Sequence, residues 1–172
     1  AEAERRCPDV VFLRPRMALY SEYSQAVWRT VREVVPVVEQ VGIDEGYLDL
    51  AGVDPEPRRA RDVAEAVQSA VRAATSLSCS LGVASCKVVA KIASDRRKPG
   101  GLTVVPPGRE AAFLAPLDVR SLPGVGPRAE ERLWAAGIRH IGELAEVIGD
   151  TLNHQAADGF TTYRSHIVGL AK

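Results

Sequence analysis

The sequence is poor in aromatic residues and cysteine, and it has no long apolar run. Phe, Trp and Tyr make up 5% of its 172 residues, so Val, Leu, Ile and Ala must build most of any core. Its three cysteines show no Cys-x-x-Cys spacing, which argues against a disulfide framework or zinc site and indicates a reducing compartment. No run approaches the roughly 18 apolar residues of a membrane span, and no signal-peptide pattern is present. We therefore expect a cytoplasmic protein without a membrane partner.

Charge of one sign is not in excess either. Lys and Arg together number 22, and so do Asp and Glu. A nucleic-acid partner would therefore require a local basic patch, because the protein as a whole is not basic. With 46% hydrophobic and 26% charged residues, the composition is that of a globular protein with one ordinary domain or two small ones.

Short apolar runs alternate with amphipathic stretches between residues 10 and 105. We expect strands at 10–13, 37–43, 47–50, 77–84 and 102–105, and helices at 20–34, 60–74 and 86–94. Ser85 is a plausible cap for the last helix, with Val88, Val89 and Ile92 buried. At least one hairpin lies among the strands, which favours an α+β fold in which helices cover one face of a mixed sheet.

The composition shifts at Pro106-Pro107-Gly108, and no strong strand signal follows. We place a domain boundary near residue 106. The remainder is expected to form short helices at 109–114, 128–136, 141–147 and 160–171.

Two adjacent acids, Asp44 and Glu45, follow an apolar run and precede Gly46, which would permit a tight turn before the strand at 47–50. Carboxylates at the tip of a hairpin suit Mg²⁺, which takes oxygen ligands from one or two carboxylates and from substrate phosphates. The alternative interpretation is a solvated turn.

A second motif runs from Leu122 through Gly124, Val125 and Gly126 to Arg128. Glycines in a tight hairpin before a helix expose backbone N–H groups, which can bind phosphate. Such a helix-hairpin-helix unit would hold a nucleic-acid backbone without sequence preference. The alternative is an ordinary corner between two helices.

Five basic residues lie between positions 87 and 98, towards the end of the helix expected at 86–94. They could contact a triphosphate or a DNA backbone, because lysine is a compact counter-charge for phosphate. They could equally be solvated cations that interact with the helix dipole. The sequence leaves both interpretations open.

The order of these motifs resembles that of the Y-family of translesion DNA polymerases, most closely its DNA polymerase IV branch. The likeness lies in Cys7-Pro8, Tyr20 with Ser24, residues 42–49, 80–84, 87–95, 98–101 and 122–126. It implies a palm domain at residues 1–106 that lacks its first strand and the fingers, followed by an all-α thumb at 107–172. The stretch 163–171 would be the last thumb helix.

By matching positions, the resemblance implies that Asp44 and Glu45 hold two catalytic Mg²⁺ ions and that Lys98 contacts the incoming deoxynucleoside triphosphate. Gly124, Val125 and Gly126, with Arg128, would grip the phosphates of primer-template DNA. Asp49 matches a family position that we interpret as structural. A sliding clamp could bind only through segments that this sequence lacks.

The sequence also departs from the family pattern. Two bridged metal ions require about three acidic side chains, and the strand that carries the third in the family has no counterpart here. Gly42 replaces the usual serine before Ile-Asp-Glu. We therefore expect a palm–thumb portion that is inactive alone, with an exposed sheet edge or a gap beside Ile43 that promotes self-association. The alternatives are a non-catalytic DNA-binding module and a polymerase-like accessory scaffold.

Overall fold

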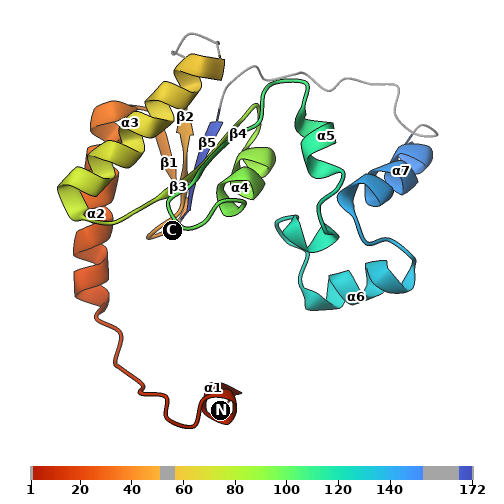
Figure 1. Ribbon diagram of the computed structural model, residues 1–172, viewed down its shortest axis with the longest axis horizontal. Helices are drawn as coiled ribbons and strands as arrows, with labels where there is room; N and C mark the ends of the chain where they lie inside the picture. The colour runs from red at the N-terminus through yellow and green to blue at the C-terminus, as the bar shows by residue number, and fades with distance from the viewer. Residues whose placement is uncertain (1, 51–56, 153–166, 172) are drawn as a thin grey trace.

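A computed structural model describes residues 2–50, 57–152 and 167–171 of the chain. The elements in chain order are α1 (Glu2–Arg6), α2 (Met17–Val34), β1 (Val38–Gln40), β2 (Gly46–Asp49), α3 (Pro57–Thr75), β3 (Ser80–Ala84), α4 (Lys87–Asp95), β4 (Leu102–Val104), α5 (Glu110–Leu114), the 3₁₀ turn η1 (Val119–Ser121), α6 (Pro127–Ala135), α7 (Ile141–Leu152) and β5 (Ile167–Ala171). Figure 1 shows a sheet flanked by α2, α3 and α4, with a group of short helices, α5 to α7, beside it.

The strands form one mixed sheet in the order β1-β2-β5-β3-β4. Strands β3 and β4 are parallel, whereas the other neighbours are antiparallel. The central strand β5 comes from the C-terminal part of the chain and pairs with β2 on one side and β3 on the other. It therefore joins the β1-β2 hairpin to the β3-β4 pair.

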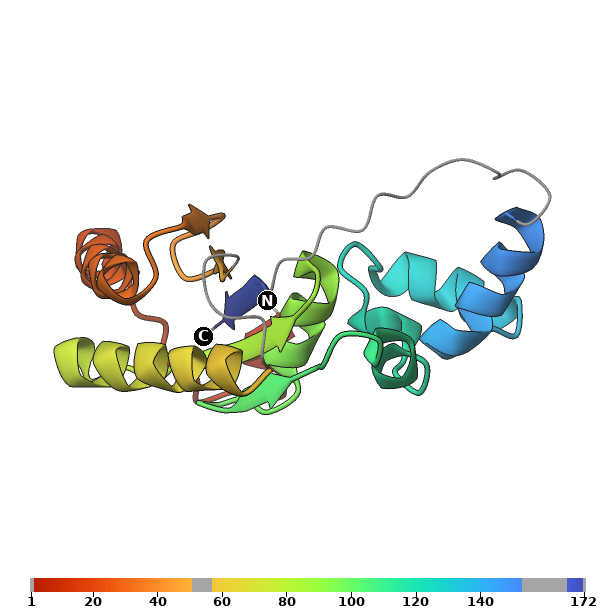
Figure 2. The ribbon, with the colours of Figure 1, turned by 90° about the horizontal axis from the view of Figure 1, so that it is seen from above.

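Helices cover both faces of this sheet. Alternate residues of a strand point to opposite faces. In β3, Leu81 and Val83 belong to the core cluster that includes α2 and α3, whereas a Cβ atom at Gly82 would overlap the carbonyl oxygen of Ala90 in α4. The expectation of helices on one face is therefore wrong: α2 and α3 lie on one face and α4 on the other (Figure 2). This explains why all of β3 is buried.

The main core lies between the sheet and the α2-α3 layer. Its fully buried side chains include Trp28 of α2, Leu48 of β2 and Val67 of α3. Trp28 is 1% exposed and is the only aromatic residue in the buried core of the described ranges. Apart from Cys79, Val, Leu and Ala supply the rest of this cluster, as the composition predicts. None of the helices within these ranges is long and apolar enough to cross a membrane.

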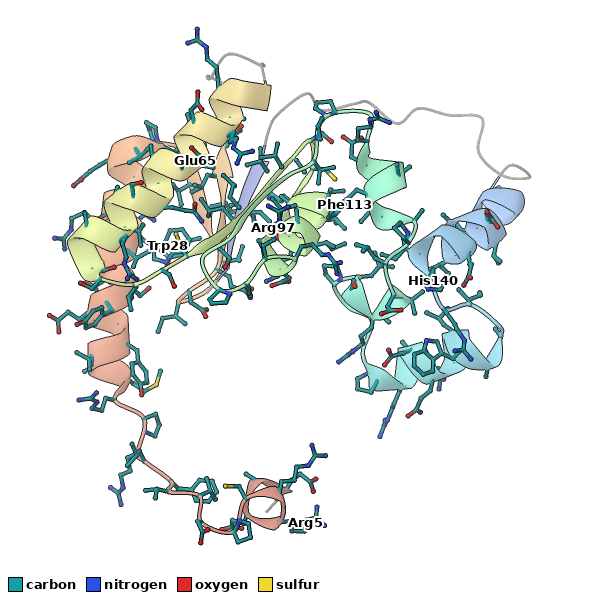
Figure 3. The ribbon with its side chains drawn as sticks, in the orientation of Figure 1. Arg5, Trp28, Glu65, Arg97, Phe113 and His140 are labelled. Atoms are coloured by element: carbon teal, nitrogen blue, oxygen red, sulfur yellow. The ribbon has the colours of Figure 1, made fainter. Side chains whose placement is uncertain are left out.

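The helices α5, α6 and α7 with η1 form a smaller unit against α4. Ile92 of α4, Leu117 and Ile141 make its buried cluster. Phe113 of α5 packs against the same cluster and points toward α4 (Figure 3). The segment before η1 runs alongside the start of α7, where the N–H of Ile141 donates to the carbonyl of Leu117 at 2.8 Å.

Most of the predicted elements are confirmed. The helices expected at 20–34, 60–74, 86–94, 109–114, 128–136 and 141–147 correspond to α2, α3, α4, α5, α6 and α7. The strands expected in 37–50, 77–84 and 102–105 correspond to β1, β2, β3 and β4, most of them shorter than expected.

The helix predicted for 160–171 is wrong at residues 167–171, which form β5; the rest of that range lies outside the described residues. The apolar run Ile-Val-Gly-Leu-Ala pairs with β2 and β3, both of which would otherwise present unpaired backbone groups. Strand β5 covers the edge of β2 at residues 46–49, whereas Ile43 lies in the loop before β2 and is 44% exposed, so the edge or gap expected beside it stays a prediction.

Three further local expectations are wrong. The predicted strand at 10–13 has no partner in the described chain, and Val11, Phe12 and Leu13 are exposed. Ser85 does not cap α4, because its hydroxyl donates instead to the carboxylate of Glu110. Val88, expected in the core, is 47% exposed, whereas Val89 and Ile92 are buried as predicted.

Candidate functional site

Asp44 and Glu45 lie in the loop 41–45 that connects β1 to β2. The N–H groups of Val41 and Gly42 both donate to the carbonyl oxygen of Glu45, at 3.1 and 3.0 Å. The loop is therefore closed by its own backbone, and the two acids occupy its last two positions.

Helix α2 contacts this loop from the main core. The indole Nε1–H of Trp28 donates to the carbonyl oxygen of Ile43 at 3.3 Å, and the hydroxyl of Ser24 donates to the same oxygen. Gly46 is not part of a turn, as the sequence suggested, but begins β2. A Cβ atom there would lie 2.5 Å from Cη2 of Trp28 and 2.7 Å from the carbonyl oxygen of Glu39. Glycine is required by this close approach.

The two carboxylates contact different elements. Asp44 lines a cleft of about 600 Å³ together with Tyr20 and Tyr23 of α2 and Leu77. The carboxylate of Glu45 accepts a hydrogen bond from the ammonium group of Lys91 in α4 at 2.6 Å. One acid thus lies beside the start of α2, and the other is paired across the sheet with α4.

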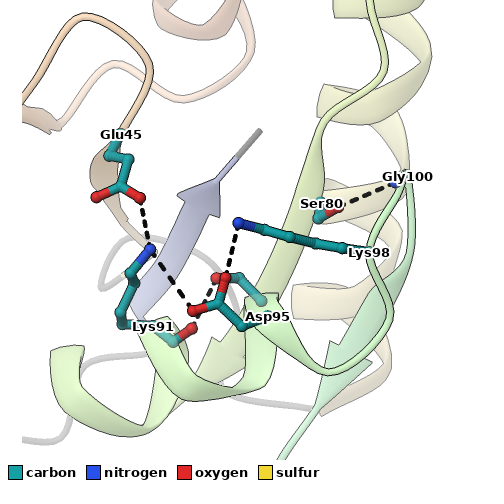
Figure 4. A network of polar contacts seen from close by, with 7 residues as sticks. Glu45, Ser80, Lys91, Asp95, Lys98 and Gly100 are labelled. Carbon is teal, nitrogen blue, oxygen red and sulfur yellow. Dashed lines mark hydrogen bonds and ion pairs between the residues drawn. The ribbon is translucent and has the colours of Figure 1, made fainter. Parts of the chain in front are cut away.

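The pair between Glu45 and Lys91 is part of a chain of alternating charges (Figure 4). The ammonium nitrogen of Lys91 also lies 3.7 Å from Oδ2 of Asp95, whose Oδ1 lies 2.7 Å from Nζ of Lys98. Burial lowers the pKa of Lys91, but the hydrogen bond to Glu45 and the charges of Asp95 and Glu45 outweigh it and raise that pKa above 10.5. Lys91 is therefore a cation at neutral pH.

The five basic residues of 87–98 do not form a free cationic patch. Lys87 pairs with Glu39, Lys91 with Glu45, and Lys98 with Asp95. Arg96 and Arg97 are exposed beyond the end of α4. The role of Asp95 was not predicted from the sequence, although its spacing of four residues from Lys91 and three from Lys98 was a usable signal.

The donor set suits a single divalent cation better than two. Asp44 and Glu45 could hold one Mg²⁺ whose other ligands are water or phosphate. Within the described ranges, no group of three or more His, Cys, Asp or Glu side chains could hold a metal ion. Strand β5 does not add a carboxylate, because its register with β2 pairs Gly46 with Leu170 and so brings Ala171 next to Glu45.

The hairpin 122–126 leads directly into α6. The N–H of Val125 donates to the carbonyl of Leu122 at 3.0 Å, and Gly124 has a φ of +93°, which favours glycine. Gly126 is the N-cap residue of α6, and Pro127 follows at its first position. In the described chain, no backbone hydrogen bond uses the N–H groups of Gly124, Gly126 or Arg128. These donors are available to an anion.

The turn between α6 and α7 shows what free N–H groups before a helix can bind. At the start of α7, the carboxylate of Glu143 accepts hydrogen bonds from the N–H groups of Arg139 and His140, at 2.7 and 2.9 Å. These backbone bonds, followed by the side chain of His140, lower the pKa of Glu143 to about 2. The N–H groups before α7 are therefore already bound by the carboxylate of Glu143. No carboxylate of the described residues accepts a hydrogen bond from the free N–H groups of the hairpin 122–126.

The chain matches two family models. Residues 1–95 match the impB/mucB/samB family, and residues 107–138 match the IMS family HHH motif. It is 42% identical over 153 residues to DNA polymerase IV of Streptomyces coelicolor, covering 88% of this chain and 32% of that protein. It is 37% identical over 164 residues to DNA polymerase IV of Neisseria meningitidis serogroup B, covering 95% of this chain and 52% of that protein. The chain thus spans between about a third and a half of these curated relatives.

Solved structures give a similar result. A DinB family error-prone DNA polymerase from Sulfolobus solfataricus matches with a TM-score of 0.79 and 26% identity, covering 90% of this chain and 46% of that one. An insertion ternary complex of Dbh DNA polymerase matches with a TM-score of 0.77 and 27% identity, covering 89% of this chain and 44% of that one. The fold of the described residues is thus that of the matching part of these polymerases.

Proposed function

The chain belongs to the impB/mucB/samB family, and we propose on this basis that it is the palm and thumb portion of a DNA-directed DNA polymerase that copies damaged templates. The observation that carries the proposal is the 42% identity to a DNA polymerase IV over 153 residues. Its substrates would be primer-template DNA and deoxynucleoside triphosphates. Residues 1–106 would form the palm, together with β5, and the helices from residue 107 the thumb.

Asp44 and Glu45 are the residues that would hold Mg²⁺. Mg²⁺ bound there would lower the pKa of the primer 3′-hydroxyl, which makes it a better nucleophile, and would stabilise negative charge on the pyrophosphate leaving group. The protein positions both carboxylates on a loop whose backbone is closed on itself and is held by α2. Because the described residues offer two carboxylates, we expect this chain to bind one ion and to extend a primer poorly or not at all.

Lys98 would contact the triphosphate and Lys91 would lie between it and the metal site. Both ammonium groups are held by Asp95, at 2.7 Å from Lys98 and 3.7 Å from Lys91. A triphosphate carries more negative charge than Asp95 and would compete with it for Lys98.

The hairpin 122–126 would hold the DNA backbone. The unused N–H groups of Gly124, Gly126 and Arg128 lie at the start of α6, where the helix dipole also favours phosphate. Contacts of this kind set the position of the duplex but do not read its sequence.

Binding of Mn²⁺, a paramagnetic substitute for Mg²⁺, tests the metal part of the proposal. We expect saturable binding by electron paramagnetic resonance, weakened at least about tenfold by Glu45→Gln because a ligating carboxylate is lost. Glu39→Gln is the matched control, since Glu39 is an exposed acid of β1 that pairs with Lys87. Equal loss in both variants, or none in either, would contradict the assignment.

A non-catalytic DNA-binding module is the second candidate, favoured by the absence of a three-acid group among the described residues. It predicts salt-sensitive binding of primer-template DNA without specific Mn²⁺ binding. Gly124→Ala should weaken DNA binding in a mobility-shift assay. Gly108→Ala is the control, because Gly108 also has a positive φ and no neighbour within 4 Å, but lies outside the hairpin.

A further inference from the structure

We propose that Ser24 and Trp28 are positioning residues that hold the loop carrying Asp44 and Glu45 by binding the carbonyl group of Ile43. The hydrogen bonds and packing that support this role do not depend on any ligand. The reason for holding the loop, which is to present its carboxylates to a divalent cation, rests on the proposed function.

Two donors from one helix converge on a single oxygen. Ser24 and Trp28 are one turn apart on α2 and therefore share a face of the helix. Both are buried, at 5% and 1% exposure, and both donate to the carbonyl of Ile43, which directly precedes the acids. The loop is thus tied to the most buried part of α2.

Trp28 also contacts the other end of the loop. Its six-membered ring lies against the backbone of Gly46, so close that a Cβ atom there would be 2.5 Å from Cη2 and 3.1 Å from Cζ3. The indole N–H holds residue 43 and the ring edge holds residue 46. Asp44 and Glu45 lie between these two points, so a shift of the indole would move both ends of their loop.

The contact of Ser24 differs from those of Thr30 and Thr75, two other hydroxyl groups on helices. Thr30 of α2 donates to the carbonyl of Ala26, and Thr75 of α3 donates to that of Val71, each four residues back in its own helix. This is the usual local partner of a hydroxyl in a helix. Ser24 instead crosses to a loop that lies 19 residues away in sequence.

Carboxylates that are already held in place bind a cation more tightly, because less conformational entropy is lost when the ion binds. Asp44 and Glu45 are only partly buried, so core packing of their own side chains does not order them. The contacts from α2 therefore act together with the backbone hydrogen bonds of the loop itself to keep the backbone of the two acids in one conformation.

Amide hydrogen exchange provides a test that needs no metal. The N–H groups of Val41 and Gly42 bond to the carbonyl of Glu45 and report on closure of the loop. We expect Ser24→Ala and Trp28→Phe each to speed exchange at these two amides by about three- to tenfold, the effect of losing one hydrogen bond. Thr30→Val, which removes a hydroxyl of the same helix that does not reach the loop, should leave both amides unchanged.

Mn²⁺ affinity, measured on the same variants and corrected for the folded fraction, supplies the second readout. Faster exchange together with an affinity about three- to tenfold lower, and no effect of Thr30→Val, would support the inference. Unchanged exchange in Ser24→Ala, or faster exchange with unaltered Mn²⁺ affinity, would overturn it. If the unmodified chain binds no Mn²⁺, the proposed metal site fails, whereas exchange still decides whether Ser24 and Trp28 hold the loop.

Discussion

Gly42 precedes Asp44 and Glu45 within their loop and Gly46 follows them at the start of β2, and substituting each glycine with alanine should have opposite effects on stability. Gly46→Ala would place a methyl group 2.5 Å from the ring of Trp28 and 2.7 Å from the backbone oxygen of Glu39. Gly42→Ala would meet nothing closer than 3.9 Å. Neither glycine has a positive φ, so the comparison isolates the effect of space from that of backbone conformation.

The expected magnitude follows from what would have to move. Overpacking costs about 1–3 kcal/mol, and a backbone oxygen and a fully buried indole place Gly46→Ala near the upper end, at about 3 kcal/mol. Replacing glycine by alanine lowers the conformational entropy of the unfolded chain, which raises the free energy of unfolding by about 0.4–1 kcal/mol in both variants. We therefore expect Gly46→Ala to lower the free energy of unfolding by about 2 kcal/mol and Gly42→Ala to raise it by up to about 1 kcal/mol.

Urea unfolding followed by far-ultraviolet circular dichroism measures both changes, and about 2 kcal/mol corresponds to a fall in Tm of about 4–8 °C for a chain of this length. Gly46→Ala should also alter the near-ultraviolet signal of Trp28, because the ring must move. Equal stabilities of the two variants would refute the close packing of Trp28 on β2. A destabilised Gly42→Ala would refute the described path of the loop.

Three other changes test separate parts of the structure. Glu143→Gln should remove a contribution to stability that is present above pH 4.5 and is lost as the pH falls toward about 2, because the folded-state pKa of Glu143 is lowered; acid unfolding curves of the two proteins should converge at low pH. Lys91→Met should lower the free energy of unfolding at neutral pH. The difference between the two proteins should shrink as the pH rises above 10.5, because the pKa of Lys91 is raised in the folded state and its ion pairs stabilise the fold only while Lys91 is protonated. Deleting residues 167–172 should leave β2 and β3 with unpaired edges and produce dimers or larger species in analytical ultracentrifugation.

The helices were predictable because their signal is local. The apolar residues of α3 recur at helical spacing within one continuous stretch, and the core that buries them needs only that face. Strand β5 was not predictable in this way. Five apolar residues fit a helix turn as well as a strand, and its partners β2 and β3 lie more than 80 residues earlier in the chain.

The apolar run at residues 10–13 shows the same limit in reverse. Its composition resembles that of β5, yet Val11, Phe12 and Leu13 are exposed and belong to no strand, because no sheet edge lies beside them in the described structure. Local apolar content indicates that a segment can pair, but the position of the partner decides whether it does.

In the candidate site, the sequence identified residue types but not their partners. Asp44 and Glu45 were predicted at the tip of a hairpin, and they occupy the last two positions of the loop between β1 and β2. The cation that holds Glu45 lies 46 residues away on α4, and the hydroxyl that holds Ile43 lies 19 residues away on α2. Gly46 was assigned to a turn because glycine is common in turns. The structure instead requires glycine at this position because the side chain of Trp28 lies against its backbone.

The chain of charges from Glu45 to Lys98 links the two ends of the site. A divalent cation at Glu45 would compete with the ammonium group of Lys91 for the same carboxylate. Lys91 would not be left unpaired, because Asp95 is already 3.7 Å away. The carboxylate of Asp95 would then interact more strongly with Lys91 and less strongly with Lys98. The ammonium group of Lys98 would become available to an anion. If Glu45 holds a metal ion and Lys98 a phosphate, as proposed above, the two binding events would therefore favour each other through the carboxylate of Asp95.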